Sequence, residues 1–287
     1  MLMKILPPTR VTAPALSDLI ILPRQCGGNS RVVCCVDYGY HGPGQGMETL
    51  NSQIESELIE AGASLVGFAD ISGLPAVMRD HMKSAISIAV ALDVAVVGEI
   101  SEGPTRRYYH EYKRVNEFLS CLSGKTVDDL EKRGHNARAI DPTIRIEGSA
   151  WKALATPLPH KTVATLAGLG WIGKSALLIT QRYGPAVRLA TVLTDARLDA
   201  GTPVDDSRCG DCTKCVERCP AKAIVGENWQ KGSERESIYD AHACRAMATN
   251  LAGRMDIPAT ICGICIHACP WTQKYISRQT SGSESAD

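Results

Sequence analysis

The chain has 287 residues, which allows one large domain or two smaller ones. An apolar share of 44% and a charged share of 22% are ordinary for a folded globular protein and exclude general disorder. Lysine plus arginine and aspartate plus glutamate both number 31, so the composition carries no strong signal of nucleic-acid or membrane binding. No apolar run approaches the roughly 18 residues of a membrane-spanning helix.

The first 46 residues differ in composition from the rest of the chain. They are rich in proline and glycine and show no sustained helical or strand period apart from the segment RVVCCV. A good helical pattern starts directly afterwards, at Met47. We therefore expect residues 1–46 to be either an extension upstream of a natural start at Met47 or a disordered arm.

From Met47 the pattern predicts an α/β domain that extends to residue 200. A helix begins at Met47 and stops at Gly62. Two short apolar runs, 64–68 and 85–92, are typical of buried strands, and the helical segment 75–83 lies between them. This alternation predicts a β-α-β unit.

A long helix is expected after the break at Gly103-Pro104. Its apolar positions recur at helical spacing, and Gly124 is expected to end or kink it before a second helical piece at 126–132. Cys121 is expected to be a small core residue of this helix. Three further strands are predicted, at residues 137–140, 176–180 and 186–193.

Residues 159–195 contain a glycine-rich stretch that satisfies two nucleotide-binding patterns. Gly168, Gly170 and Gly173 fit G-x-G-x-x-G, and the octet from Gly168 to Ser175 fits the phosphate-loop pattern. A phosphate loop needs a strand before it and a full helix after it. Gly184-Pro185 interrupts the chain soon afterwards, so a nucleotide site is the less favoured interpretation.

Eight of the twelve cysteines lie between residues 209 and 269. The first run, CGDCTKCVERCP, has the spacing of bacterial two-cluster ferredoxins, and CGICIHACP repeats it with one cysteine missing, which Cys244 can supply. The cysteine before each proline ligates the opposite cluster in this motif. The spacing therefore predicts two 4Fe-4S clusters, one held by Cys209, Cys212, Cys215 and Cys269, the other by Cys219, Cys244, Cys262 and Cys265.

Zinc and disulfide bonds are the competing interpretations of these cysteines. Zinc sites also use C-x-x-C pairs, but they seldom use eight cysteines with two C-P endings. Disulfide frameworks suit short secreted chains. Clusters and reduced cysteines predict a cytoplasmic protein, with a ferredoxin-like module at 201–275 and a disordered tail at 276–287.

The ordered combination of AGLGWIGKSALLIT, YGPAVRLATVLTDA and the eight-cysteine module resembles the superfamily of epoxyqueuosine reductases and reductive dehalogenases. The resemblance implies a nitroreductase-like α/β corrinoid domain, base-off cobalamin and two 4Fe-4S clusters. It also implies that the glycine-rich stretch lines the corrinoid pocket, with glycines that let the backbone approach the macrocycle. The residues so implied are Gly168, Gly170, Trp171, Gly173 and Lys174.

The chain departs from this family at the expected proton donor. Epoxyqueuosine reductases place an aspartate and a Glu-Arg pair upstream of the glycines, and the ungapped positions here are Leu154 and His160-Lys161. His160 and Lys161 therefore become candidates for proton transfer or anion binding. Tyr109 and His110, in a YYHEYKR segment that resembles the family's D-Y-H stretch, form a second candidate pair.

The expected function is an iron-sulfur oxidoreductase that passes electrons from a ferredoxin or flavodoxin through both clusters to a corrinoid or a bound substrate. The substrate is expected to be a small molecule or a modified nucleoside, and no membrane partner is expected. One alternative is a non-catalytic electron carrier or corrinoid-reducing activator. The other is a nucleotide-driven iron-sulfur protein with a phosphate loop at Gly168 to Ser175.

Overall fold

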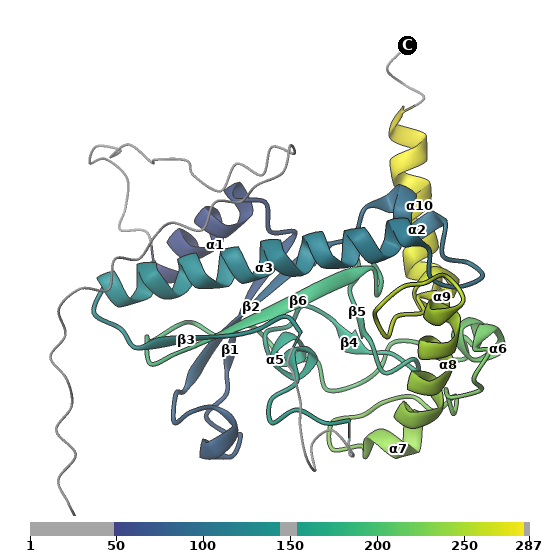
Figure 1. Cartoon of the computed structure of the whole chain (residues 1–287). Coiled ribbons are helices and arrows are strands. Elements are labelled where there is room, and N and C mark those ends of the chain that lie inside the picture. Colours follow the sequence, from purple (N-terminus) through teal and green to yellow (C-terminus); the bar gives the residue numbers. More distant parts are fainter. Residues whose placement is uncertain (1–48, 144–153, 284–287) are drawn as a thin grey trace, which may run out of the picture. The chain divides into compact units, whose positions relative to one another are not determined.

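A four-stranded antiparallel sheet forms the centre of the α/β part of the chain. The computed structural model describes residues 49–143 and 154–283 (Figure 1), so the predicted extension at 1–46 lies outside the described residues. The strand order is β1-β2-β6-β3, and every neighbouring pair is antiparallel. The strands are β1 (Leu65–Asp70), β2 (Ser84–Ala91), β3 (Ala137–Ile140) and β6 (Val187–Thr194).

Helices cover both faces of this sheet. Helices α1 (Leu50–Glu60) and α3 (Arg106–Lys132) pack on one face with a cluster that includes Ile86 and Val192. Helix α5 (His160–Leu166) packs on the other face with a cluster that includes Ala85 and Leu193. Successive side chains of a strand point to opposite faces, so β2 is buried on both sides and has an almost continuous apolar sequence. This confirms the expected buried strands.

The connection between β1 and β2 is different from the predicted helix at 75–83. It contains only a short 3-10 turn, η1 (Ala76–Met78), and the two strands run antiparallel. The expected β-α-β unit is therefore wrong. Asp80 and His81 have φ values of 51° and 62°, in the left-handed region, which is incompatible with continuing a right-handed helix.

Helix α3 continues through Gly124, contrary to the predicted end or kink. Its buried face extends past the glycine to Thr126 and Leu130, so the segment 126–132 belongs to the same helix. Packing of that face outweighs the roughly 1 kcal/mol that glycine costs inside a helix. Cys121 is exposed, and the prediction that it is a core residue is wrong because the buried face runs through Leu122 instead.

The remaining elements form a two-stranded hairpin and the cysteine-rich region. The hairpin pairs β4 (Trp171–Ile172) with β5 (Leu178–Ile179). Because α10 reaches Ser283, residues 276–283 of the predicted disordered tail are helical, and that part of the prediction is wrong. The other helices are α2 (Val94–Gly98), α6 (Lys214–Arg218), α7 (Arg235–Ile238), α8 (Ala241–Gly253), α9 (Ile264–Ala268) and α10 (Pro270–Ser283).

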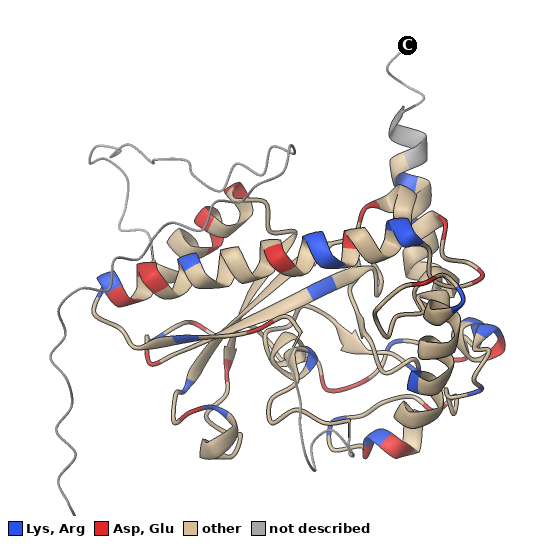
Figure 2. Ribbon diagram, viewed as in Figure 1, with Lys and Arg blue, Asp and Glu red and all other residues tan. Residues whose placement is uncertain are grey.

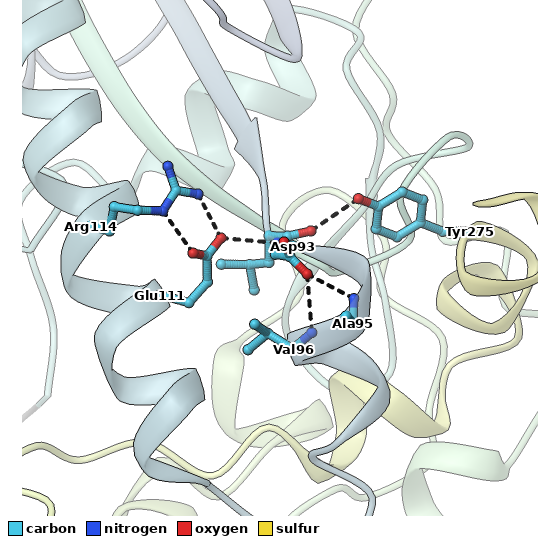
Figure 3. Close-up of polar contacts among 7 residues, drawn as sticks. Asp93, Ala95, Val96, Glu111, Arg114 and Tyr275 are labelled. Carbon is cyan, nitrogen blue, oxygen red and sulfur yellow. Dashed lines mark hydrogen bonds and ion pairs between the residues drawn. The ribbon is translucent and has the colours of Figure 1, made fainter. Parts of the chain in front are cut away.

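A polar network joins α3, the start of α2 and α10 (Figure 3). The Glu111 carboxylate, buried on α3, accepts two hydrogen bonds of 2.8 Å from Arg114 and one of 2.9 Å from the backbone N–H of Asp93. The Tyr275 hydroxyl donates to the carbonyl oxygen of Leu92 at 3.0 Å. These contacts fix the helix that follows the last cysteine against the end of β2.

Acidic and basic residues are interspersed along the described helices (Figure 2). Along α3, Lys and Arg alternate with Asp and Glu, and several of them form ion pairs. No described helix is both long enough and apolar enough to cross a lipid bilayer.

Candidate functional site

The structure brings together the first predicted set of cysteines. Cys209, Cys212, Cys215 and Cys269 all line one cavity of about 160 Å³. Burial and the neighbouring thiols raise the pKa of Cys215 to about 11. Neutral thiols that crowd together in this way gain from the replacement of their protons by iron, which binds the thiolate.

The second predicted set is gathered around α8 and α9. Cys219 caps the end of α6, Cys244 lies on α8, and Cys265 lies on α9 with Cys262 two residues before that helix. Burial raises the pKa of the Cys265 thiol, and the other three thiols lie close enough to raise it further. Burial also raises the pKa of the Cys244 thiol, and a hydrogen bond from the Tyr239 hydroxyl to its sulfur offsets part of this shift.

Each set includes one cysteine from the other sequence motif: Cys269 in the first set and Cys219 in the second. Helices α6 and α9 lie in contact, and Cys219 and Cys269 occupy equivalent positions at their ends, each followed by a proline. Among the described residues, no three Cys, His, Asp or Glu side chains converge to hold one metal ion. Thiols arranged around a cavity suit a four-iron cube better than a single zinc ion.

The glycine-rich stretch is a wall of the first cysteine cavity. Gly173 and Lys174 line this cavity, and a methyl group built on Gly173 would lie 3.4 Å from the sulfur of Cys209. Lys174 is 5% exposed, and Lys274 from α10 is the other cation in the lining. Two ammonium groups beside four thiolates complement the negative charge of a thiolate-ligated cluster.

The other glycines allow close backbone packing. A methyl group on Gly170 would lie 2.1 Å from the carbonyl oxygen of Ile179, across the hairpin. Gly168 has φ of 77° and would place a methyl group 2.7 Å from the carbonyl oxygen of Thr202. Trp171 is 1% exposed and packs edge-on against Trp271 at 5.4 Å between ring centroids. The predicted corrinoid contacts of these residues stay a prediction.

The phosphate-loop alternative is wrong. Helix α5 precedes the glycines where a phosphate loop needs a strand, and the hairpin strand β5 follows where it needs a helix. The chain therefore presents no helix N-terminus to an anion at Gly168 to Ser175.

Two adjoining cavities lie on the other side of the hairpin. Their volumes are about 290 Å³ and 820 Å³, and they share Thr156, Pro159 and Lys161 in their linings. The smaller cavity is bounded by β5 and β6, and the larger one extends to α7. These cavities provide the largest space beside the predicted residues His160 and Lys161.

His160 holds the start of α5 against the sheet. Its Nε2 lies 2.9 Å from the carbonyl oxygen of Asp141 and therefore donates, which leaves Nδ1 to accept from the Thr191 hydroxyl at 2.8 Å. Burial lowers its pKa, so the neutral ring is favoured. Both ring nitrogens are occupied, and His160 is placed to position its neighbours.

Lys161 points into the cavities and is held by one neutral partner. Its Nζ donates a 2.7 Å hydrogen bond to the carbonyl oxygen of Ala176, a buried residue with φ of 57°. Burial, with a smaller contribution from Arg235, lowers the pKa of Lys161 to about 8. Lys161 can therefore hold or release a proton near neutral pH.

The second candidate pair lies on α3. Tyr109 is partly buried and tilted against the exposed His110, with 5.7 Å between ring centroids. Neither residue lines one of the two cavities. The buried Tyr108 lies near Cys262 and Cys265 of the second cysteine set, and a methyl group on Gly263 would lie 3.3 Å from its ring.

Sequence reasoning missed two residues of these sites. Arg188 lies on β6, lines the smaller cavity and stacks on Tyr112 with 4.6 Å to the ring centroid. A charged residue inside an otherwise apolar strand was the available signal. Tyr239, which bonds Cys244, had no comparable signal because it precedes α8 in an irregular segment.

Comparison with known proteins assigns the cysteine-rich region. Residues 208–272 match the family described as the 4Fe-4S double cluster binding domain, so the chain carries a module for two such clusters. It is 35% identical to the epoxyqueuosine reductase of Gloeobacter violaceus over 200 residues, 66% of this chain and 56% of that protein. It is 34% identical to the Cyclobacterium marinum epoxyqueuosine reductase over 160 residues, 56% of this chain and 46% of that protein.

The fold is shared with solved reductases. A catabolic reductive dehalogenase in complex with 3-bromo-4-hydroxybenzoic acid superposes with a TM-score of 0.58 at 18% identity, over 81% of this chain and 34% of that one. Bacillus subtilis epoxyqueuosine reductase superposes with a TM-score of 0.51 at 20% identity, over 78% and 65%. These likenesses confirm the predicted α/β fold, and the chain spans about half the length of the curated relatives it matches.

Proposed function

We propose that this chain is an iron-sulfur reductase similar to epoxyqueuosine reductases, which passes electrons through two 4Fe-4S clusters to a corrinoid or a bound substrate. The observation that carries the proposal is the position of the hairpin β4–β5. Its residues Gly173 to Ser175 line the first cysteine cavity, and its residues Ala176 to Leu178 line the cavity that contains Lys161. Ser175 and Ala176 are consecutive residues, so one hairpin turn contributes to the walls of both cavities.

In this proposal each cluster is held by four of the eight cysteines, and each set of four includes cysteines from both motifs. When bound, the clusters supply one-electron transfer at potentials set by nearby charge and solvent. Lys174 and Lys274 place positive charge at the first site, which stabilises its reduced, more negative form. Tyr239 donates to Cys244 at the second site.

A corrinoid would be held in the two adjoining cavities, where it would supply a strongly nucleophilic or electron-donating metal centre. The smaller cavity has a mostly apolar lining, whereas the larger one also carries charged side chains from Asp205 and Lys231 and from residues 234–236. Among the described lining residues the only imidazole is that of His160, and both of its nitrogens are occupied. This donor set suits a corrinoid bound without a protein ligand. In this proposal the residues from Gly168 to Lys174 pack behind the wall of the corrinoid pocket and hold that wall in place.

Proton supply is assigned to Lys161. His160 is engaged at both ring nitrogens, whereas the Lys161 ammonium keeps two N–H donors beyond its bond to Ala176. Its lowered pKa suits proton donation near neutral pH. Tyr109 and His110 are a second candidate pair for proton transfer. They could take this role only if the substrate reaches α3.

The substrate is proposed to be a small molecule or a modified nucleoside, in keeping with the names of the sequence relatives. Leu154 at the family's aspartate position argues that the proton donor, and with it the preferred substrate, differ from those of epoxyqueuosine reductases. The proposed electron donor is a ferredoxin or flavodoxin, and the proposed compartment is the cytoplasm.

A non-catalytic carrier is the less favoured function, because the relatives are reductases and the chain keeps cavities next to the cysteine sites. Anaerobic reconstitution followed by titration with hydroxocobalamin separates the two. A reductase should bind about eight iron atoms per chain and one cobalamin, and should turn over epoxyqueuosine or another oxidised substrate with a chemical reductant. Full iron loading without cobalamin binding or turnover would indicate a carrier.

A further inference from the structure

Two cationic side chains face the smaller cavity, of about 290 Å³, and no described residue of its lining is acidic. Lys161 reaches it from the first turn of α5, and Arg188 reaches it from β6. Both are partly buried. The rest of the lining consists of proline, threonine, alanine, leucine and valine side chains together with the neutral His160.

Neither cation is neutralised by a described carboxylate. Lys161 donates only to a carbonyl oxygen, and the charged group that affects its pKa is another cation, Arg235. Arg188 donates from Nε to the Asn116 side chain at 2.9 Å and from Nη2 to the carbonyl oxygen of Pro142 at 3.2 Å. Partly buried charges without counter-charges are costly unless a ligand supplies them.

The surrounding structure holds the two cations in place. Arg188 stacks on Tyr112, and its contacts to Asn116 and Pro142 fix the plane of the guanidinium. His160 ties α5 to Thr191 on the same strand as Arg188, so Lys161 is presented to the same cavity. Nη1 of Arg188 has no protein partner among the described residues, and the Lys161 ammonium keeps two donors.

We propose that Lys161 and Arg188 form a binding site for an anionic oxygen group, a carboxylate or a phosphate, carried by the ligand of the reductase site. The aliphatic walls of the cavity accept the apolar part of that ligand. The inference rests on the proposed function for the identity of the whole ligand, while the anion site itself can be tested without any redox reaction.

Butyrate, butyl phosphate and neutral butyramide are suitable probes, because they share an aliphatic tail and differ in the head group. Calorimetric titration of the full, iron-loaded chain should show binding of an anion and not of butyramide. Whichever anion binds more tightly identifies the group as carboxylate or phosphate. Binding of neither anion, or equal binding of butyramide, overturns the proposal.

Matched variants connect the binding to the two residues. Lys161→Met and Arg188→Gln should each weaken anion binding by on the order of tenfold, and Lys161→Arg and Arg188→Lys should restore much of it. Lys83→Gln removes an equal charge at an exposed position outside the cavity lining and should leave the affinity unchanged. Anion binding that survives both charge-removing variants contradicts the site.

Iron and sulfide content and the melting temperature are measured for each variant. A variant that keeps its iron and its fold but loses anion binding supports the site whether or not the chain proves to be a reductase. If the protein binds anions as expected but has no reductase activity, the proposed function fails and the anion site stands.

Discussion

The ammonium group of Lys161 donates a 2.7 Å hydrogen bond to the carbonyl oxygen of Ala176, at the turn of the β4–β5 hairpin. The same turn has Gly173 and Lys174 on its other side, in the lining of the first cysteine cavity. The hairpin therefore links a titratable cation to the wall of an iron-sulfur site. A substitution on one side of the turn should therefore affect the site on its other side.

Anion affinity should depend on pH through Lys161. Its pKa, lowered to about 8 by burial, means that Lys161 loses its charge as the pH rises above that value. Burial lowers the pKa of the neighbouring His160, so its ring is already neutral in this range. Butyrate binding should be constant between pH 7 and 7.5 and should weaken up to tenfold per pH unit above about 8, until the pKa of the complexed lysine is reached.

The control for this experiment is Lys161→Arg, which keeps its charge at every accessible pH. Its affinity profile should be flat from pH 7 to 9.5. A wild-type profile that is equally flat would show that Lys161 does not contact the anion.

Double cysteine variants should reveal the exchange of ligands between the two motifs. Cys269 is grouped with Cys209 in one cavity although Cys262 and Cys265 belong to the same sequence motif as Cys269. Replacing Cys209 and Cys269 together by alanine should therefore remove one cluster, roughly four iron atoms per chain.

Replacing Cys262 and Cys269 together should damage both clusters, although these residues belong to one motif. Iron and sulfide analysis with electron paramagnetic resonance of the reduced protein distinguishes the outcomes. If each motif held its own cluster, the pattern of losses would be reversed.

Gly170→Ala should destabilise the chain, because the added methyl group would lie 2.1 Å from the carbonyl oxygen of Ile179 and would force the hairpin apart. We expect a loss of about 1–3 kcal/mol in the free energy of unfolding, measured by denaturant titration of the iron-loaded protein. Gly73→Ala is the control, since a methyl group there meets no atom within 4 Å.

Gly124→Ala should have the opposite effect. Gly124 lies inside α3, and no atom lies within 4 Å of a methyl group placed there. Alanine loses less backbone entropy in a helix, so the variant should gain roughly 0.5–1 kcal/mol of stability. A destabilised variant would contradict the open surroundings that the structure gives to Gly124.

Tyr275→Phe should loosen α10. The variant removes the hydroxyl that donates to the carbonyl oxygen of Leu92 and leaves that buried acceptor unpaired (Figure 3). The expected cost is about 1–2 kcal/mol in the free energy of unfolding. Hydrogen exchange of the α10 amides should increase more than that of the α3 amides, and an equal increase in both would argue against a local anchor.

The sequence by itself determined the chemistry of the cysteine region and the main elements of the α/β part. Two, two and three residues between successive cysteines, with a proline after the fourth, leave few arrangements other than a two-cluster module. Apolar periodicity was sufficient for α3 and for the buried strands, because long amphipathic or fully buried segments carry strong local patterns.

Tertiary structure decided the direction of the strands and the partners of the glycine-rich stretch. The β1–β2 connection depends on left-handed residues such as Asp80, which local composition does not predict. The turn of the β4–β5 hairpin places Gly173 beside Cys209, and Lys161 of α5 and Arg188 of β6 line one cavity. Such contacts arise from packing between distant segments, so no local pattern could have specified them.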